Sequence, residues 1–322
     1  MRKILIGIQG NNMTNFKKTT LALIAASAML SGNVYAGDKV TVYGKINATI
    51  QSDDTGESET KIKSNASRFG LKGGVKINED LKAIYQLEWQ VNVSDKDKDN
   101  VTARNQWVGL KGNFGGVMIG RNDTALKKSQ GKVDLFSDYN ADIKQLFSGE
   151  NRMEDTLTYA SPKFGGFSFI GTFVTEEDNS GKNGSSLALM YGDAKLKKSS
   201  VYAAVAMDAD VKGVDTTRLT LRGKLGDIKV GAMWNESEKA GGTKGDGFLV
   251  SAAYGIGNTT LKMQYQDSDD LNGKAKQPAE SATVGVDYKL AKNVKVFGFY
   301  TDTSFEDNSD ASHLAVGMEY KF

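Results

Sequence analysis

The chain has 322 residues, 39% of them hydrophobic, with a formal net charge of +2, no cysteine and one histidine. No apolar run reaches the roughly 18 residues that a transmembrane helix needs, so a helical membrane protein is excluded. The lack of cysteine excludes disulfides, thiolate metal sites and a cysteine nucleophile, and the small net charge gives no indication of nucleic-acid binding.

Residues 1–36 predict a cleaved secretory signal peptide. Lys17 and Lys18 precede the apolar stretch Leu21–Met29, and the segment ends in Val34-Tyr35-Ala36, which fits the small-residue cleavage rule. We place the cleavage after Ala36, and Met13 offers an alternative start. The segment carries basic but no acidic side chains, so the mature domain, residues 37–322, is close to neutral.

From residue 37 onward the hydrophobic pattern has a period of two. In the first segment Val42, Ile46 and Ile50 share one face, while Lys45 and Asn47 share the other. An apolar face opposite a polar face along every strand is typical of a transmembrane β-barrel, whose outside meets lipid and whose lumen holds water. Only 2 prolines occur in the chain, which fits a closed sheet because proline removes a ladder donor.

Polar gaps between these segments alternate between short and long. The short gaps lie near 78–80, 112–116, 163–166, 192–198, 226–227, 255–258 and 291–293. The long gaps lie near 52–61, 94–100, 122–155, 176–185, 208–215, 235–245, 267–280 and 301–310. Seven turns and eight loops join 16 strands, so the sequence predicts an all-β fold, a 16-stranded antiparallel barrel with both ends of the mature chain on the turn side.

Several motifs resemble the trimeric general diffusion porins of β- and γ-proteobacteria. They are Ser67–Gly73, Arg104–Gly112, Ile119–Arg121, Leu157–Pro162 and a final alternating strand that ends in Phe322. The resemblance implies an outer-membrane location in a Gram-negative cell and a homotrimer in contact with outer-membrane lipid and lipopolysaccharide. It also implies that Phe322 is the signal read by the barrel-assembly machinery, and that the third loop folds inward to narrow the pore.

The longest gap, Asn122–Asp155, is that third loop. A loop of this length is uncommon unless it is functional, and its apolar side chains would be costly to leave in water. The resemblance places a basic wall opposite acidic groups of the loop. We expect the wall residues on the polar faces of their strands to be Arg68 and Arg104, joined by Arg152, and the acidic residues to be Asp134, Asp138 and Asp142.

These features predict a water-filled channel for passive diffusion of small hydrophilic solutes and ions, which selects by size and by the charges at the constriction. The alternatives are a substrate-selective channel of the same fold and a barrel used for adhesion or structure. We expect no enzymatic activity, because His313 is the sole histidine and no nucleophile motif accompanies it. We also expect no cofactor, metal or nucleic-acid partner.

Overall fold

The computed structural model describes residues 40–95, 100–175, 182–239, 241–242 and 244–322. The predicted signal peptide and its cleavage position lie outside these residues. Among the residues described, no helix has the length and hydrophobicity needed to cross a membrane.

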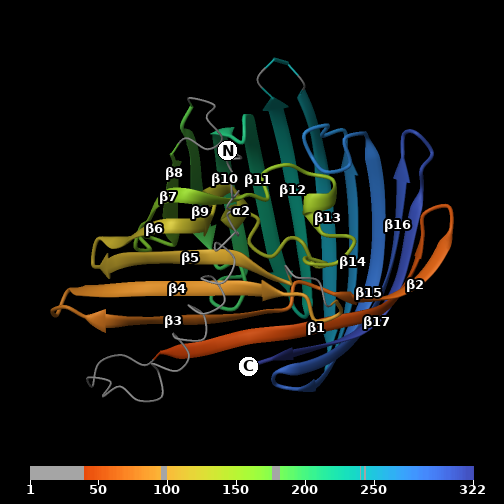
Figure 1. Cartoon of the computed structure of the whole chain (residues 1–322), viewed down its shortest axis with the longest axis horizontal. Helices are drawn as coiled ribbons and strands as arrows, with labels where there is room; N and C mark the ends of the chain where they lie inside the picture. The colour runs from red at the N-terminus through yellow and green to blue at the C-terminus, as the bar shows by residue number, and fades with distance from the viewer. Residues whose placement is uncertain (1–39, 96–99, 176–181, 240, 243) are drawn as a thin grey trace, which may run out of the picture. The chain divides into compact units, whose positions relative to one another are not determined.

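The described chain is almost entirely β-strand, with one short α-helix and one 3-10 helix, both between β6 and β7 (Figure 1). The strands are β1 (Thr41–Asp54), β2 (Ser58–Ser64), β3 (Arg68–Lys76), β4 (Leu81–Val91), β5 (Val101–Gly112), β6 (Gly115–Asp123), β7 (Arg152–Ala160), β8 (Phe167–Val174), β9 (Gly184–Gly192), β10 (Val201–Val211), β11 (Val214–Leu225), β12 (Ile228–Lys239), β13 (Lys244–Ile256), β14 (Thr259–Ser268), β15 (Ala279–Ala291), β16 (Val294–Phe305) and β17 (Ala311–Lys321). The helices are α2 (Ala125–Ser129) and η1 (Ile143–Gln145).

These strands form one closed antiparallel barrel. β2 and β3 both pair with β1 and together make a single barrel strand, interrupted by a bulge in which Ala66 has a positive φ of 48°. Each later strand pairs with the next, and β17 pairs with β1, so no sheet edge remains. Counting β2 and β3 as one strand gives 16, so the predicted 16-stranded antiparallel barrel is confirmed.

Side-chain exposure is the reverse of that in a water-soluble protein. On β1, Ile50 is 59% exposed whereas the neighbouring Gln51 is fully buried. The same alternation continues on β11, where Leu219 and Leu221 point outward and Arg218 and Thr220 are buried. An apolar outer surface and a polar interior are what a barrel in lipid requires, because only lumen-facing groups can meet water.

Several hairpins are tighter than the sequence predicts. The gap expected at 208–215 is a two-residue turn, because β10 continues to Val211 and β11 begins at Val214. Gly213 supplies the positive φ of 70° that this turn uses. The expected gaps at 235–245 and 301–310 are likewise partly strand. These strands continue beyond the apolar band, where both faces are polar and the alternation in hydrophobicity ends.

Barrel closure depends on a close approach at Gly44. Its N–H donates to the carbonyl oxygen of Phe322 at 3.0 Å, and the N–H of Phe322 donates back at 3.2 Å. A Cβ on Gly44 would lie 2.5 Å from both the carbonyl oxygen of Arg68 and the ring of Phe322. The terminal aromatic residue therefore packs on a position that only glycine fills without displacement.

Replacing Gly44 with alanine is expected to weaken closure between β1 and β17. Overpacking of this kind costs about 1–3 kcal/mol, because backbone as well as side chain must move. Gly223→Ala is the matched control, since its nearest neighbour, a Val230 methyl, is 3.8 Å away. The resistance of the folded barrel to heating, measured by its electrophoretic mobility in detergent, should fall for Gly44→Ala only. Equal behaviour of the two variants would contradict this role.

Candidate functional site

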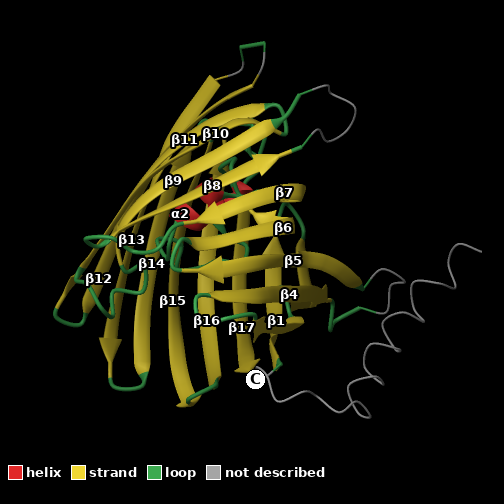
Figure 2. Ribbon diagram, turned by 90° about the vertical axis from the view of Figure 1, so that its left-hand side faces the viewer, coloured by secondary structure: helices red, strands yellow, loops and turns green. Residues whose placement is uncertain are grey.

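The segment between β6 and β7, residues 124–151, folds across the inside of the barrel; we call it loop 3. It contacts β1 through Tyr139, whose hydroxyl accepts from Asn47 Nδ2 at 3.1 Å. It also contacts β10, where the hydroxyl of Tyr202 donates to the carbonyl of Ser129 at 2.8 Å. β1 and β10 are separated by many strands in both directions around the ring, so a segment that touches both must cross the lumen (Figure 2).

Local sequence explains the two short helices of loop 3. The side chain of Thr124 accepts from the N–H of Lys127 and caps α2. In the same way, the carboxylate of Asp142 accepts from the N–H of Lys144 and caps η1. These caps satisfy backbone donors that would otherwise be left unpaired inside the barrel.

Apolar side chains anchor loop 3 in notches of the wall. Phe136 is fully buried and packs edge-on against Phe299 of β16, with ring centroids 6.2 Å apart. A Cβ on Gly285 of β15 would lie 2.7 Å from the Phe136 ring, and one on Gly231 of β12 would lie 2.9 Å from Val133. Burying each such side chain stabilises the loop by about 1.5–3 kcal/mol. The wall thus has glycine at the two positions where Phe136 and Val133 of loop 3 pack against it.

Polar wall residues complete the attachment. Gln264 of β14 accepts from the N–H of Leu135 at 2.9 Å and donates to the carbonyl of Ala141 at 3.0 Å. Ser251 of β13 donates to the carbonyl of Val133 at 2.7 Å. Polar side chains of the lumen wall therefore hold loop 3 in place through hydrogen bonds to its backbone.

Loop 3 and the wall opposite it enclose an open cavity of about 1000 Å³. Its lining contains ten basic and six acidic side chains. The basic residues are Lys45, Lys63, Arg68, Arg104, Lys127, Lys132, Lys144, Arg152, Lys274 and Lys321, and the acidic residues are Glu88, Asp123, Asp138, Asp142, Glu150 and Glu319.

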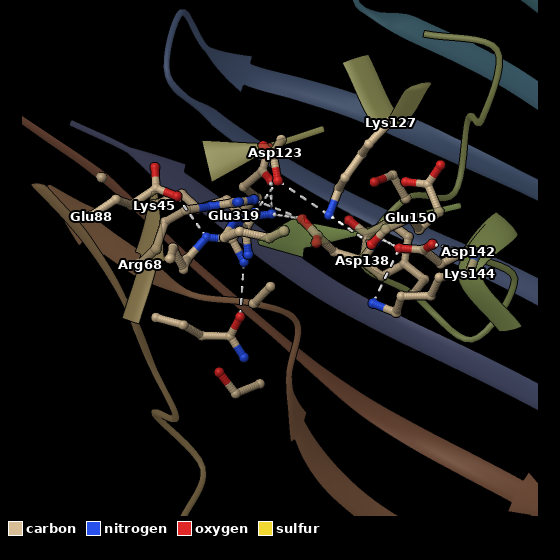
Figure 3. A pocket seen from close by; sticks show the side chains of 18 of the residues that line it. Lys45, Arg68, Glu88, Asp123, Lys127, Asp138, Asp142, Lys144, Glu150 and Glu319 are labelled. Carbon is tan, nitrogen blue, oxygen red and sulfur yellow. Dashed lines mark hydrogen bonds and ion pairs between the residues drawn. The ribbon is translucent and has the colours of Figure 1, made fainter. Parts of the chain in front are cut away.

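Asp138 lies at the contact between loop 3 and the basic wall (Figure 3). One carboxylate oxygen accepts from Arg68 Nη2 at 2.7 Å and from Lys45 Nζ at 2.9 Å. Burial alone would raise the pKa of Asp138, but Lys45 and Arg68 outweigh it and hold the pKa below its usual range. Asp138 is therefore ionised at neutral pH and links the loop to two wall cations.

Arg104 reaches the cavity through a β-bulge. Regular alternation on β5 would turn it outward with Val108 and Leu110, which are exposed. The β4–β5 register shifts between Leu87 and Trp89, and Arg104 Nε donates to Glu88 at 2.6 Å. Arg104 lines the cavity, and the bulge places it there, not the strand alternation expected from the sequence.

Arg152 lies beside these residues at the start of β7. Its Nη2 donates to Asp123 at 2.9 Å and its Nε to Asn105 at 2.8 Å. Asp123 also pairs with Lys127 of α2 at 3.3 Å. The three predicted arginines, Arg68, Arg104 and Arg152, thus all line one cavity.

The three predicted acidic residues separate in the structure. Asp138 and Asp142 line the cavity, but Asp134 is not among the lining residues. Asp134 is 6% exposed and accepts from the backbone N–H groups of Phe136 and Ile143. Burial, then the neighbouring Asp142, raises the pKa of Asp134. Its carboxyl group organises the loop and does not face the pore.

Sequence reasoning did not single out several lining charges. Lys45 and Glu88 lie on polar strand faces, so alternation already placed them in the lumen. Lys274 has no such signal, because it belongs to the segment between β14 and β15 that folds onto loop 3, where the N–H of Ala275 donates to the carbonyl of Gln145 at 3.0 Å. Opposed acidic and basic rows were expected. Instead, opposite charges lie in direct contact.

Comparison with known proteins agrees with the barrel fold. Residues 19–308 match the family described as Gram-negative porin. This chain belongs to the Gram-negative porin family. The outer membrane porin PhoE of Enterobacter cloacae is 27% identical over 95% of this chain and 100% of its own length.

Solved porins share the fold. An anion-selective porin from Comamonas acidovorans has a TM-score of 0.73 at 20% identity, covering 88% of this chain and all of that one. The trimer form of OmpT from Vibrio cholerae has a TM-score of 0.67 at 16% identity, covering 89% of this chain and 100% of that chain. The protein is accordingly a general porin of the Gram-negative outer membrane, a channel and not an enzyme.

Proposed function

We propose that this porin is a homotrimer of water-filled channels narrowed by loop 3, and that it conducts small anions in preference to cations. The observation that carries the preference is the excess of basic over acidic side chains around the cavity. Fixed charge in a narrow passage with low-dielectric walls raises the local concentration of the opposite ion.

The pattern of ion pairs supports the same preference. Each acidic lining residue is in an ion pair, including Glu150, which accepts from the buried Arg218 at 2.6 Å. Within the described part of the chain, Lys63, Lys132 and Lys274 line the cavity without an ion pair to any carboxylate. Lys63 instead donates to the amide oxygen of Asn140 at 2.6 Å. The uncompensated charge in the passage is therefore positive.

A KCl gradient across a planar bilayer tests the proposal. The reversal potential of the wild-type pore should have the sign of chloride preference. The preference should weaken as salt is raised, because the Debye length falls from about 10 Å at 0.1 M to about 3 Å at 1 M. A Lys63→Gln, Lys132→Gln, Lys274→Gln triple variant should lose most of it. Cation preference in the wild type at low salt would contradict the proposal.

The alternatives remain a substrate-selective channel and a structural or adhesive barrel. Among the tyrosines and phenylalanines that the structure describes, Tyr43, Tyr139 and Phe322 line the cavity. This lining offers charges to a passing solute and no continuous aromatic surface. It favours diffusion of hydrophilic solutes.

A further inference from the structure

A buried arginine without an acidic partner lies away from the constriction. Arg222 of β11 is 4% exposed, its Nη1 donates to the carbonyl of Ala194, and its Nε has no hydrogen-bond partner. Among the ion pairs of the described residues, none includes Arg222. A buried charge is normally paired, because leaving water is costly for an isolated ion. The fold leaves this guanidinium uncompensated.

Two lysines beside Arg222 face each other with the same charge. Lys224 of β11 and Lys229 of β12 are direct cross-strand partners, and both share the lumen side of their strands with Arg222. The charged groups that act on Lys229 are Arg222, Lys224 and Lys197, all of them positive. Like charges directly opposite each other destabilise a sheet. Neither lysine has an ion-pair partner in the described residues.

The turn between β9 and β10 brings further lysines to this place. Leu196 is buried against Tyr202 and Ala204, so the turn folds onto the wall. Its first residue, Asp193, accepts backbone N–H groups from Lys195, Lys197 and Lys198 at 3.0 Å each. These three bonds lower the pKa of Asp193 to about 2. Its carboxylate therefore organises the turn through the backbone, and the ammonium groups of these three lysines make no ion pair within the described part of the chain.

Loop 3 lies against the same turn. A Cβ on Gly131 would be 3.2 Å from the Cβ of Ala194. Lys132 follows directly, and after burial the positive charge of Lys195 is the largest influence that lowers the pKa of Lys132. Lys132 lines the constriction, whereas the positive charges of the β9–β10 turn, β11 and β12 gather beyond it at the turn end of the lumen, which faces the periplasm in barrels of this type.

We propose that this end of the lumen holds a binding site for a small multivalent oxyanion, with Arg222 at its base and Lys197, Lys224 and Lys229 around it. Guanidinium and ammonium groups are the donors that bind phosphate-type oxygens most strongly. A ligand of two or more negative charges would neutralise the buried arginine and relieve the repulsion between Lys224 and Lys229. The site is separate from the constriction, because neither Arg222 nor these three lysines line that cavity.

Calorimetric titration of the detergent-solubilised protein with inorganic pyrophosphate tests the site without requiring conduction. The wild type should bind, and Arg222→Met should bind about tenfold more weakly, the loss of a hydrogen bond to a charged group. A Lys224→Gln, Lys229→Gln double variant should weaken binding similarly, which keeps the test valid if Arg222→Met fails to fold. The matched control is Lys292→Gln, which removes a positive charge from the β15–β16 turn, away from the proposed site.

Three calorimetric results would contradict the proposed site. The first is no pyrophosphate binding by the wild type, and the second is wild-type affinity in the Lys224, Lys229 double variant. The third is loss of binding in a Lys63→Gln, Lys274→Gln variant, which would place the anion at the constriction.

A second experiment uses planar bilayers with oriented channels. Pyrophosphate should reduce the current at lower concentration from the turn side than from the loop side. Equal block from both sides would also contradict the proposal. Failure of the calorimetric test would leave the channel function itself untouched.

Discussion

Replacing Arg68 and Arg104 with serine is expected to move the reversal potential of the pore toward that of a cation-selective channel. The double variant removes two of the ten basic groups that line the cavity and keeps all six acidic ones. It also leaves Glu88 without Arg104 and leaves Asp138 with Lys45 as its remaining cationic partner. Released carboxylates attract cations where the guanidinium groups had repelled them.

The control for this double variant is Lys289→Ser, Lys292→Ser, which removes the same charge at the exposed end of β15. Reversal potentials in a KCl gradient compare the two. The control should stay close to the wild type. An unchanged reversal potential in the Arg68, Arg104 variant would remove both arginines from the charge filter of the pore.

Replacing Gly285 with leucine is expected to displace loop 3 and widen the pore. The new side chain would occupy the notch that holds the Phe136 ring, which lies 2.7 Å from the position of a Cβ. Phe136 is fully buried, and its expulsion would forfeit about 1.5–3 kcal/mol of loop anchoring. Single-channel current should become larger or noisier, and liposomes should admit larger sugars.

Gly298→Leu supplies the matched control for loop displacement. Gly298 is on the neighbouring strand β16, its nearest neighbours are 3.4 Å and 3.7 Å from a Cβ, and the flanking Phe297 and Phe299 are the residues buried toward loop 3. This variant should keep the wild-type conductance. Identical sugar permeation in the Gly285 and Gly298 variants would show that the Phe136 notch does not hold the loop.

The strands and their facing could be predicted because lipid imposes a physical difference between the two sides of each strand. Ile46 and Ile50 face outward, and Asn47 is buried, as the alternation predicts. The strands β10 and β11 continue to Val211 and from Val214, further than the alternation predicts, because the hydrophobic pattern does not mark where a hairpin turns. The sequence therefore predicts the barrel well and predicts the length of its outer hairpins poorly.

The charged residues that line the pore, and the partners they bind, were harder to predict from the sequence. Arg68 could be placed from alternation, whereas Arg104 depends on a bulge that leaves no mark in the hydrophobic pattern. Within loop 3 no periodicity separates Asp138, which binds two wall cations, from Asp134, which binds backbone N–H groups. Such roles depend on tertiary contacts between segments many residues apart. Only the folded chain brings those segments together.

Single-channel recording in planar bilayers tests the central claim most directly, that this barrel is an open trimeric pore narrowed by loop 3. The protein lacking residues 1–36 should insert in ohmic steps that close in threes, with a chloride preference in a KCl gradient. Absence of channels from correctly folded protein, or steps that never group in threes, would contradict the account.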